Sequence, residues 1–236
     1  SDELESRCDG KFSFSGGLVY NNFDERINVI EPFDCPKEWY DNISIDPGFR
    51  NPLSCHFYAV DFDGNIYVID EHYQADKDME YHSKKILEIA DRLNWPRLGN
   101  GKLSALIDSA ANQTTLACQK SVAQLFYDYG ICVNTNVNKD LFSGINRVKS
   151  LICNSMGERK LYIFKNCVNM IREIKGYFWG NGDCPIKKDD HAMDELRYYV
   201  MSNPENHLKT TKNSIQKDKE RLFRKAKNER YGKRRI

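Results

Sequence analysis

Several motifs that would indicate a function directly are missing from this sequence of 236 residues. It has no G-x-x-x-x-G-K-[ST] segment, so we expect no ATP binding through a P-loop. It has no C-x-x-C pair, which argues against a zinc knuckle, and no Cys/His motif supports nucleophilic catalysis. No apolar run approaches the roughly 18 to 20 residues that cross a membrane, and the first residues carry no signal peptide. We therefore expect no membrane association.

The eight cysteines are widely scattered and do not form the spacing pattern of a disulfide-stabilised domain. Several lie in apolar stretches, such as residues 131–133 and 151–153, where a free thiol behaves as a small hydrophobic side chain. This pattern favours a reducing, cytoplasmic setting. The chain starts at Ser1 without a methionine, which indicates an excised fragment.

The net charge of +1 conceals two parts of opposite sign. From Lys209 to the end there are twelve Lys/Arg and three Asp/Glu residues, a net charge of +9. The preceding residues hold 23 bases and 31 acids, a net charge of −8. An acidic body with a basic tail suggests a metal-binding core and a separate surface for an anionic partner. The alternative for the tail is a solvated terminal helix.

Length and composition suit one sizeable domain with an appendage. Residues 1–40 are expected to form an N-terminal segment with short strands at 12–20 and 27–32. Residues 41–204 are expected to form the core, which Pro204 would end. Residues 205–236 are expected to be a basic tail, either helical or disordered.

The core is expected to open with three antiparallel strands, at residues 42–46, 55–62 and 66–71. Asp63-Gly64 between the last two is a strong hairpin signal. The apolar period then changes, which predicts helices at 76–93, 114–129, 141–152, 168–177 and 189–201, with short strands at 104–108 and 131–133. A second hairpin is expected over residues 157–164.

This order of elements predicts an α/β fold, in which three antiparallel strands feed into βα units and form a mixed sheet with helices on both faces. The ribonuclease H-like fold has this order. In that fold the first and fourth strands are neighbours, which would place Asp46 beside Asp108.

Acidic residues end two of the predicted strands. Asp46 is followed by Pro47-Gly48, and Asp108 is followed by Ser109. Carboxylates are costly at the ends of apolar strands unless a cation compensates them, and Mg²⁺ or Mn²⁺ prefers such oxygen ligands. Taken alone, Asp46 is more typical of a turn and Asp108 of a helix cap. Their occurrence at two strand ends of one sheet favours a shared site.

A third acidic group lies in the segment DDHAMD at residues 189–194. We interpret Asp189 as the cap of the helix that follows. Asp194 shares a helical face with Asp190 (i,i+4) and with His191 (i,i+3), so the third acid remains open between Asp190 and Asp194. His191 as a ligand would favour Mn²⁺ over Mg²⁺; the alternative is a partly buried surface histidine.

Other charged residues have two interpretations each. Arg197 lies three residues beyond Asp194 and is placed to brace it by an ion pair. Asp70-Glu71 would supply an outer ligand or keep an edge strand soluble. Four bases near the expected sheet edge are candidate phosphate contacts, although each alone is more often a solvated base: Arg50, Lys139, Arg147 and Lys149.

An ordered set of short motifs resembles a known family, the C-terminal nuclease domain of the large terminase subunit of tailed bacteriophages. The similarity covers roughly residues 26–202. The motifs are VIEPF at 29–33, EW at 38–39, SIDPG at 44–48, DGNIY at 63–67, DE at 70–71, ID at 107–108, GINRVK at 144–149, EIKGY at 173–177 and DHAMDELRY at 190–198.

This resemblance implies a ribonuclease H-like domain that cuts concatemeric phage DNA when packaging starts and ends. Asp46 and Asp108 match the first two catalytic acids. The third acid matches Asp194 in relatives with an H-x-x-D pattern and Asp190 in relatives where the paired aspartates act. The family also has a β-hairpin near its active site, for which residues 157–164 are the natural candidate. The ATPase motor of the family would precede Ser1.

The resulting prediction is a metal-dependent DNA endonuclease domain. Asp46, Asp108 and Asp194 would hold two Mg²⁺ or Mn²⁺ ions about 4 Å apart, with His191 and Asp190 as further candidate ligands. Double-stranded DNA would be held mainly through its phosphates, with little sequence preference. The resemblance implies the ATPase domain, the small terminase subunit, the portal and the procapsid as partners, in the host bacterial cytoplasm.

Two other functions stay open at this point. A resolvase or ribonuclease H-type enzyme would use the same metal chemistry on branched or hybrid substrates. From a different class, the domain would serve mainly as a docking module for portal or procapsid.

Overall fold

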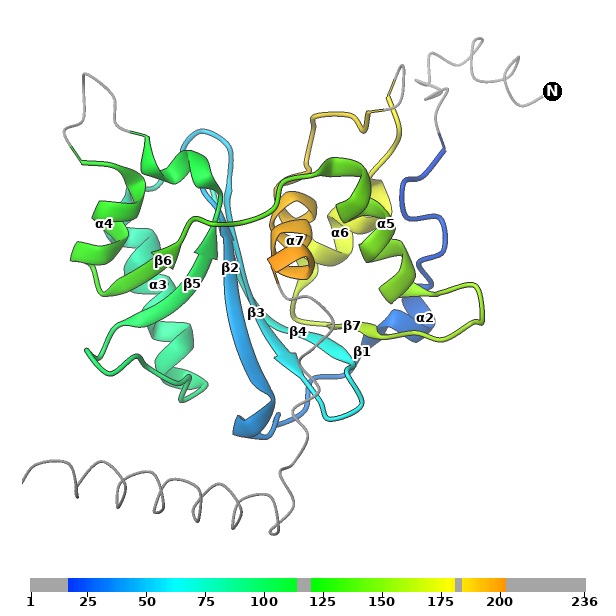
Figure 1. Ribbon diagram of the computed structural model, residues 1–236, viewed down its shortest axis with the longest axis horizontal. Helices are drawn as coiled ribbons and strands as arrows, with labels where there is room; N and C mark the ends of the chain where they lie inside the picture. Colours follow the sequence, from blue (N-terminus) through cyan, green and yellow to red (C-terminus); the bar gives the residue numbers. More distant parts are fainter. Residues whose placement is uncertain (1–16, 114–119, 181–183, 203–236) are drawn as a thin grey trace, which may run out of the picture.

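The computed structural model describes residues 17–113, 120–180 and 184–202 (Figure 1). Its strands are β1 (Val29–Ile30), β2 (Tyr40–Asp46), β3 (Leu53–Val60), β4 (Ile66–Gln74), β5 (Leu103–Ile107), β6 (Ile131–Asn134) and β7 (Leu161–Phe164). Its α-helices are α2 (Glu25–Asn28), α3 (Met79–Arg92), α4 (Val122–Asp128), α5 (Leu141–Ile152), α6 (Val168–Gly176) and α7 (His191–Ser202). Two short 3₁₀ helices are η1 (Lys37–Trp39) and η2 (Ser109–Asn112).

The described strands form one mixed sheet in the order β1-β7-β4-β3-β2-β5-β6. The pairs β2–β3 and β3–β4 are antiparallel, and the remaining neighbours are parallel. This arrangement confirms the predicted α/β, ribonuclease H-like architecture and the position of the first core strand beside the fourth. Helices α3 and α4 cover one face of the sheet, and α5, α6 and α7 lie on the other (Figure 1).

Local signals in the sequence explain where the helices begin. The side chain of Asp78 accepts a hydrogen bond from the backbone of Tyr81 at the start of α3, and Asp140 does the same for Ser143 at the start of α5. Ser121 and Gln124 form a reciprocal capping box at the start of α4. These caps satisfy backbone N–H groups that have no partner within the helix.

On β2 and β3, the face of the sheet toward α3 is largely apolar. Ile43 and Phe57 lie opposite each other on β2 and β3, and both are fully buried. Trp95, which follows α3, packs edge-on against Phe57 with ring centroids 5.2 Å apart and stacks on Tyr40 at 4.6 Å. Burial of aromatic side chains of this size supplies much of the free energy that stabilises a domain core.

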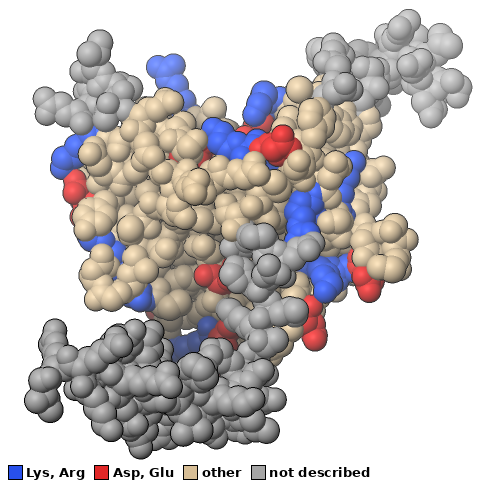
Figure 2. Space-filling view, in the orientation of Figure 1, with Lys and Arg blue, Asp and Glu red and all other residues tan. Residues whose placement is uncertain are grey.

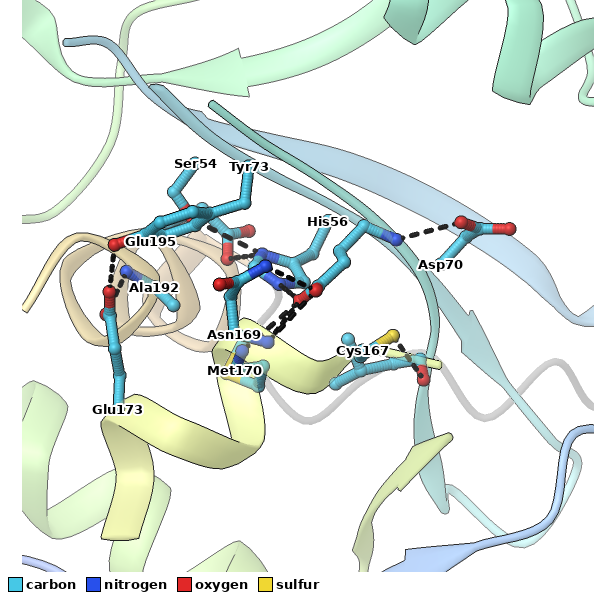
Figure 3. A network of polar contacts seen from close by, with 12 residues as sticks. Ser54, His56, Asp70, Tyr73, Cys167, Asn169, Met170, Glu173, Ala192 and Glu195 are labelled. Atoms are coloured by element: carbon cyan, nitrogen blue, oxygen red, sulfur yellow. Dashed lines mark hydrogen bonds and ion pairs between the residues drawn. The ribbon is translucent and has the colours of Figure 1, made fainter. Parts of the chain in front are cut away.

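The opposite face of the same strands is polar and is covered by α7. His56 is fully buried, and its Nδ1 lies 2.9 Å from Glu195 Oε2 on α7 (Figure 3). Its Nε2 lies 3.1 Å from Glu71 Oε2 on β4. Burial lowers the pKa of His56, but the two carboxylates outweigh that effect and raise it to about 9. His56 is therefore a cation at neutral pH and balances two buried acids.

Glu71 also connects the sheet to α6. Its carboxylate accepts hydrogen bonds from the backbone N–H of Asn169 at 2.9 Å and of Met170 at 3.2 Å, in the first turn of α6. Tyr58 completes the layer, because its hydroxyl donates to Glu195 at 2.9 Å and its ring stacks on Tyr199 of α7 at 3.7 Å. Helices α6 and α7 are thus held on the sheet by charged contacts as well as by packing.

The prediction of a second hairpin over residues 157–164 was wrong. Strand β7 pairs in parallel with both β4 and β1, so it belongs to a crossover connection from α5. Leu161 lies opposite Ile66, whereas Gln74 at the other end of β4 lies opposite Leu53. The turn at Gly157 therefore lies at the other end of the strands from Asp46, away from the predicted acidic site.

Antiparallel pairing occurs instead just before α7. Trp179 and Pro185 form a bridge, and the backbone N–H of Ile186 donates to the carbonyl of Phe178 at 2.9 Å. The sequence predicted only a loop around Gly180. Its short apolar stretches gave no sign of this pairing.

Three smaller predictions also need correction. Residues 27–32 are not one strand, since Ile27 lies in α2 and only Val29–Ile30 pair in the sheet. β4 is not an edge strand, because β7 covers its open side, and Glu71 binds His56. Asp189 does not directly precede α7; it has a positive φ of 49°, and the carbonyl of Asp190 accepts the first helical hydrogen bond.

Several other predictions lie wholly or partly outside the described residues. These are the strand expected at 12–20, the first part of the helix expected at 114–129 and the basic tail at 205–236. The six described cysteines are free thiols. No described helix is long and apolar enough to span a membrane.

We predict that His56→Ala destabilises the fold by about 3–5 kcal/mol, because it leaves two buried carboxylates without a cation. Denaturation in urea at pH 7 measures this change. Arg26→Ala removes an ion pair that is 89% exposed on the arginine side and should leave the denaturation midpoint unchanged. An equally small effect for both variants would contradict the role of His56.

The contact of His56 with Glu71 and Glu195 also predicts that the stability of the fold depends on pH. The folded state raises the pKa of His56 from 6.5 to about 9, so its stabilising contribution is fully present below pH 6.5 and is lost as the pH rises through about 9. The unfolding midpoint of the wild type should fall over this range more steeply than that of His56→Gln. Parallel pH profiles for the two proteins would disprove the assignment.

Candidate active site

Two predicted acids come at the ends of neighbouring strands, β2 and β5 (Figure 1). β2 and β5 are parallel neighbours, with Ser44 opposite Leu106 and Ile45 opposite Ile107. Asp46 directly follows Ile45, and Asp108 directly follows Ile107. Neighbouring strands in a sheet are about 4.8 Å apart. The adjacency expected for these two residues is therefore present in the structure.

Helix α7 brings the third group of the sequence analysis to the same edge. His191, its first residue, has Nδ1 3.0 Å from Asp46 Oδ2. One turn further on, Asp194 forms an ion pair with Arg197, as the sequence predicted, and a longer one with Lys187 at 3.5 Å. The Ser44 hydroxyl donates to the carbonyl of Glu195 at 3.2 Å, which fixes the position of α7 along β2.

The environment of Asp46 is strongly acidic. The pKa of Asp46 is raised to about 6, mainly by burial and also by the charges of Asp194 and Asp108, while the hydrogen bond from His191 opposes the increase. The charges of Asp108, after β5, and Asp194, on α7, therefore disfavour the ionised form of Asp46 on β2. Such a group is stabilised by any cation that enters it.

Asp108 is held by three close donors, and the Ser109 hydroxyl donates to it at the longer distance of 3.4 Å. Its Oδ1 accepts from the backbone N–H of Ala110 at 2.7 Å, as a cap of η2, and from Lys139 Nζ at 2.8 Å. The Tyr198 hydroxyl donates to its Oδ2 at 3.1 Å. Burial would raise the pKa of Asp108, but the hydrogen bonds from Lys139, Ala110 and Tyr198 bring it below its usual value. The interpretation of Asp108 as a helix cap is confirmed, and the residue also follows the strand beside Asp46.

Asp190 is placed differently from Asp194. It lies just before α7 and is 7% exposed, and its Oδ2 has no hydrogen-bond partner. Lys187 Nζ is 3.6 Å from that oxygen. Burial and the charge of Asp194 raise the pKa of Asp190. The pair of aspartates thus shares one lysine.

The sequence analysis did not assign a role to Tyr198, Lys187 or Glu173. Tyr198 follows Asp194 by four residues and so lies on the same face of α7, which is a signal that the sequence contained. Lys187 lies two residues before the acidic segment at 189–194. Glu173 is a buried residue on α6, and its distance in sequence from α7 concealed its role.

Glu173 satisfies the N-terminus of α7. Its Oε2 accepts from the backbone N–H of Ala192 at 2.7 Å, and its Oε1 accepts from the Tyr73 hydroxyl (Figure 3). A carboxylate at a helix N-terminus is favoured by the helix dipole and by the unpaired N–H groups there. Glu173 therefore supports the first turn of the helix that carries His191 and Asp194.

The four predicted phosphate contacts are not equivalent. Arg50 is exposed in the loop after Asp46, and Lys139 binds Asp108 directly. Arg147 and Lys149 lie on α5, where Lys149 Nζ is 5.8 Å from the centre of the Trp179 ring. A Cβ on Gly144 would lie 3.0 Å from Arg197 Cδ, so α5 approaches α7 closely beside the acidic site.

Among the described residues there is no group of three Asp, Glu, His or Cys side chains already arranged around a metal position. Each acid is paired with a cation or donor of the protein instead. The available donors are nevertheless mainly carboxylate oxygens, which suit hard divalent cations. The raised pKa of Asp46 and the Asp190 Oδ2, which accepts no hydrogen bond and has only the Lys187 ion pair at 3.6 Å, are consistent with a cation binding here.

No protein-family model matches the chain. A curated relative is the large terminase subunit of Escherichia phage T5, which is 23% identical over 207 residues. That similarity covers 81% of this chain and 43% of the T5 protein, so the chain spans less than half of the relative's length.

Solved structures show the same fold. The nuclease domain of the P22 large terminase has a TM-score of 0.64 and 17% identity, with 79% of this chain and 92% of that one covered. The large terminase of a thermophilic bacteriophage has a TM-score of 0.63 and 19% identity, with 86% of this chain and 51% of that one covered. The fold is that of large-terminase nuclease domains, and the resemblance drawn from the sequence motifs is confirmed.

We predict that Glu173→Ala costs about 1–3 kcal/mol, because the Ala192 N–H and the Tyr73 hydroxyl lose their acceptor. Glu173→Gln keeps an acceptor and should cost less. Lys175→Ala on the same helix alters only a half-exposed pair with Glu25 and serves as the control. Equal losses for the Ala and Gln variants in urea denaturation would show that Glu173 does not act as the cap.

Proposed function

We propose that this chain is the nuclease domain of a large terminase subunit of tailed phages and hydrolyses double-stranded DNA with divalent metal ions. The observation that supports the proposal is that Asp46 and Asp108 end two paired strands and that His191, in the first turn of α7, contacts Asp46. Asp194 lies one turn further along α7, and its charge and that of Asp108 contribute to the raised pKa of Asp46. Oxygen ligands in such a group fit Mg²⁺ or Mn²⁺.

Asp46, Asp108 and Asp194 would hold two metal ions, with His191 beside Asp46. When bound, such ions activate a water molecule and stabilise the leaving oxygen of the phosphodiester. The protein's own contribution is to hold the carboxylates in place. Tyr198 orients Asp108, Arg197 orients Asp194, and Glu173 supports the start of α7.

We assign the third acidic ligand to Asp194. Two observations support it over Asp190. The charge of Asp194 is among the main causes that raise the pKa of Asp46 and of Tyr198, whereas the charge of Asp190 is not. Arg197 also braces Asp194, while Asp190 precedes the helix. Asp190 remains a candidate outer ligand through its unpartnered oxygen.

DNA would be held through its phosphates by bases around the acidic group, namely Arg50, Lys139 and Lys187, with Arg147 and Lys149 on α5 further out. On the face shown in Figure 2, Lys and Arg side chains are scattered, and several lie directly beside Asp or Glu. Contacts of this kind carry no base recognition, so cleavage should show little sequence preference and strong salt sensitivity.

We propose that the other activities of the packaging motor, nucleotide binding among them, belong to polypeptide segments outside this chain. The large terminase of the thermophilic bacteriophage has also been solved in complex with ADP and with ATP-gamma-S, and this chain covers about half of it. Since the chain has no P-loop sequence, nucleotide binding would belong to the part that it does not cover. The small terminase subunit, the portal and the procapsid are the proposed partners, and the host bacterial cytoplasm is the proposed location.

Cleavage of plasmid DNA in Mn²⁺, Mg²⁺ or EDTA tests this function. We expect nicking and linearisation with either metal and none in EDTA. Four-way junctions and RNA–DNA hybrids should be cut no faster than plain duplex. Faster cleavage of either of these substrates would support the resolvase or ribonuclease H alternative. No cleavage under any condition would contradict the proposal.

Asp46→Asn and Asp108→Asn should each lower cleavage by at least about 100-fold without loss of fold, because each removes a carboxylate ligand while relieving charge repulsion. Activity and thermal unfolding are measured on the same samples. Asp128→Asn, which breaks an exposed pair with Lys120, is the matched control and should keep full activity. A folded Asp46→Asn or Asp108→Asn protein with wild-type activity would rule out the acidic site.

Asp194→Asn should lose more activity than Asp190→Asn, because Asp194 is the one whose charge acts strongly on both Asp46 and Tyr198. Anomalous diffraction from crystals soaked in Mn²⁺ locates the ions independently of activity. Density beside Asp190 and away from Asp194 would reverse the assignment.

A further inference from the structure

Lys139 contacts an oxygen of the acidic site that a bound metal ion would also contact. Its Nζ lies 2.8 Å from Asp108 Oδ1. The side chain is 44% exposed, whereas that of Asp108 is 14% exposed. Lys139 comes from the loop between β6 and α5, so it reaches the site from outside the sheet and α7.

The three close donors to Asp108 differ in how easily they can move away from it. The N–H of Ala110 belongs to the backbone of η2, which follows Asp108 directly. Tyr198 is 5% exposed and is fixed on α7. Lys139 alone among these three is a long side chain on a loop, with nearly half of its surface open to solvent.

A divalent cation on Oδ1, the Asp108 oxygen that Lys139 contacts, would lie within about 5 Å of the Lys139 ammonium group in its present position. Like charges at that distance repel one another, most strongly in a partly desolvated site. The backbone N–H and the hydroxyl carry no net charge and are compatible with the ion. Lys139 is therefore the group that must move.

We propose that Lys139 neutralises Asp108 in the metal-free protein and transfers to a DNA phosphate when a divalent cation binds. This inference rests on the proposed nuclease function. This transfer makes metal binding and DNA binding cooperative, because each metal-bound protein molecule has one more lysine free to contact the phosphate backbone. Lys139 thereby acts as a positioning residue for the substrate that is available only in the loaded state.

Metal affinity gives the first test. Isothermal titration of the DNA-free protein with Mn²⁺ should show about fivefold tighter binding for Lys139→Met, the size expected for removing a partly exposed competing ion pair. Lys139→Arg should bind Mn²⁺ as weakly as the wild type. Lys120→Met removes a comparable exposed pair with Asp128 and should change nothing. Unchanged or weaker Mn²⁺ binding by Lys139→Met would overturn the proposal.

DNA binding gives the second test. Fluorescence anisotropy with a short duplex is measured at several salt concentrations, in EDTA and in Ca²⁺. Lys139→Met should reduce the slope of log K against log salt by about one in Ca²⁺ and leave it unchanged in EDTA. A reduced slope in both conditions would mean a permanent phosphate contact, and an unchanged slope in both would mean none. Either result overturns the transfer.

The two tests separate this inference from the proposed function. If the wild type binds Mn²⁺ and cleaves DNA but Lys139→Met behaves as the wild type does, only the inference fails. If the wild type neither binds Mn²⁺ nor cleaves DNA, the nuclease proposal fails and the inference fails with it.

Discussion

The buried charges between the sheet and α7 constrain the rest of this domain. The strand face toward α7 carries His56 and Tyr58 instead of aliphatic side chains, and the helix presents Glu195 to them. A carboxylate in such a place is costly without a partner, and His56 supplies one cation for two acids. Since Glu71 also binds the first turn of α6, this contact fixes both helices relative to the sheet.

The position of α7 in turn decides which side chains meet the strand ends. His191, Asp194, Glu195 and Tyr198 follow the spacing i, i+3, i+4 and i+7, so they form one polar stripe along the helix. Glu195 in the middle is held by His56, and the flanking members reach Asp46 and Asp108. The structural contact and the candidate active site are therefore two parts of the same helical face.

The acidic group itself is balanced by protein cations. His191 contacts Asp46, Lys139 contacts Asp108, and Arg197 contacts Asp194. This balance explains how three carboxylates coexist in a folded protein before any metal binds. It also lowers the net affinity for a metal ion, because an incoming ion must displace some of these contacts before it can bind the carboxylates.

Much of the fold followed from local patterns in the sequence. Asp63-Gly64 predicted the turn between β3 and β4, where Gly64 has a φ of 78° that favours glycine, and the apolar period predicted α5 with its observed bounds. The hairpin at 157–164 failed for a clear reason. The apolar stretch LYIF indicates a strand but not its partner, and β7 found parallel partners on both sides.

The sequence by itself determined the acidic positions Asp46 and Asp108, since both end apolar strands, and it determined that His191 and Asp194 share a helical face. Only the tertiary structure decided which charges compensate them. Lys139 meets Asp108 and Glu173 meets the start of α7 across separations of 31 and 19 residues. Such contacts depend on how helices pack on the sheet, and no local spacing rule encodes that packing.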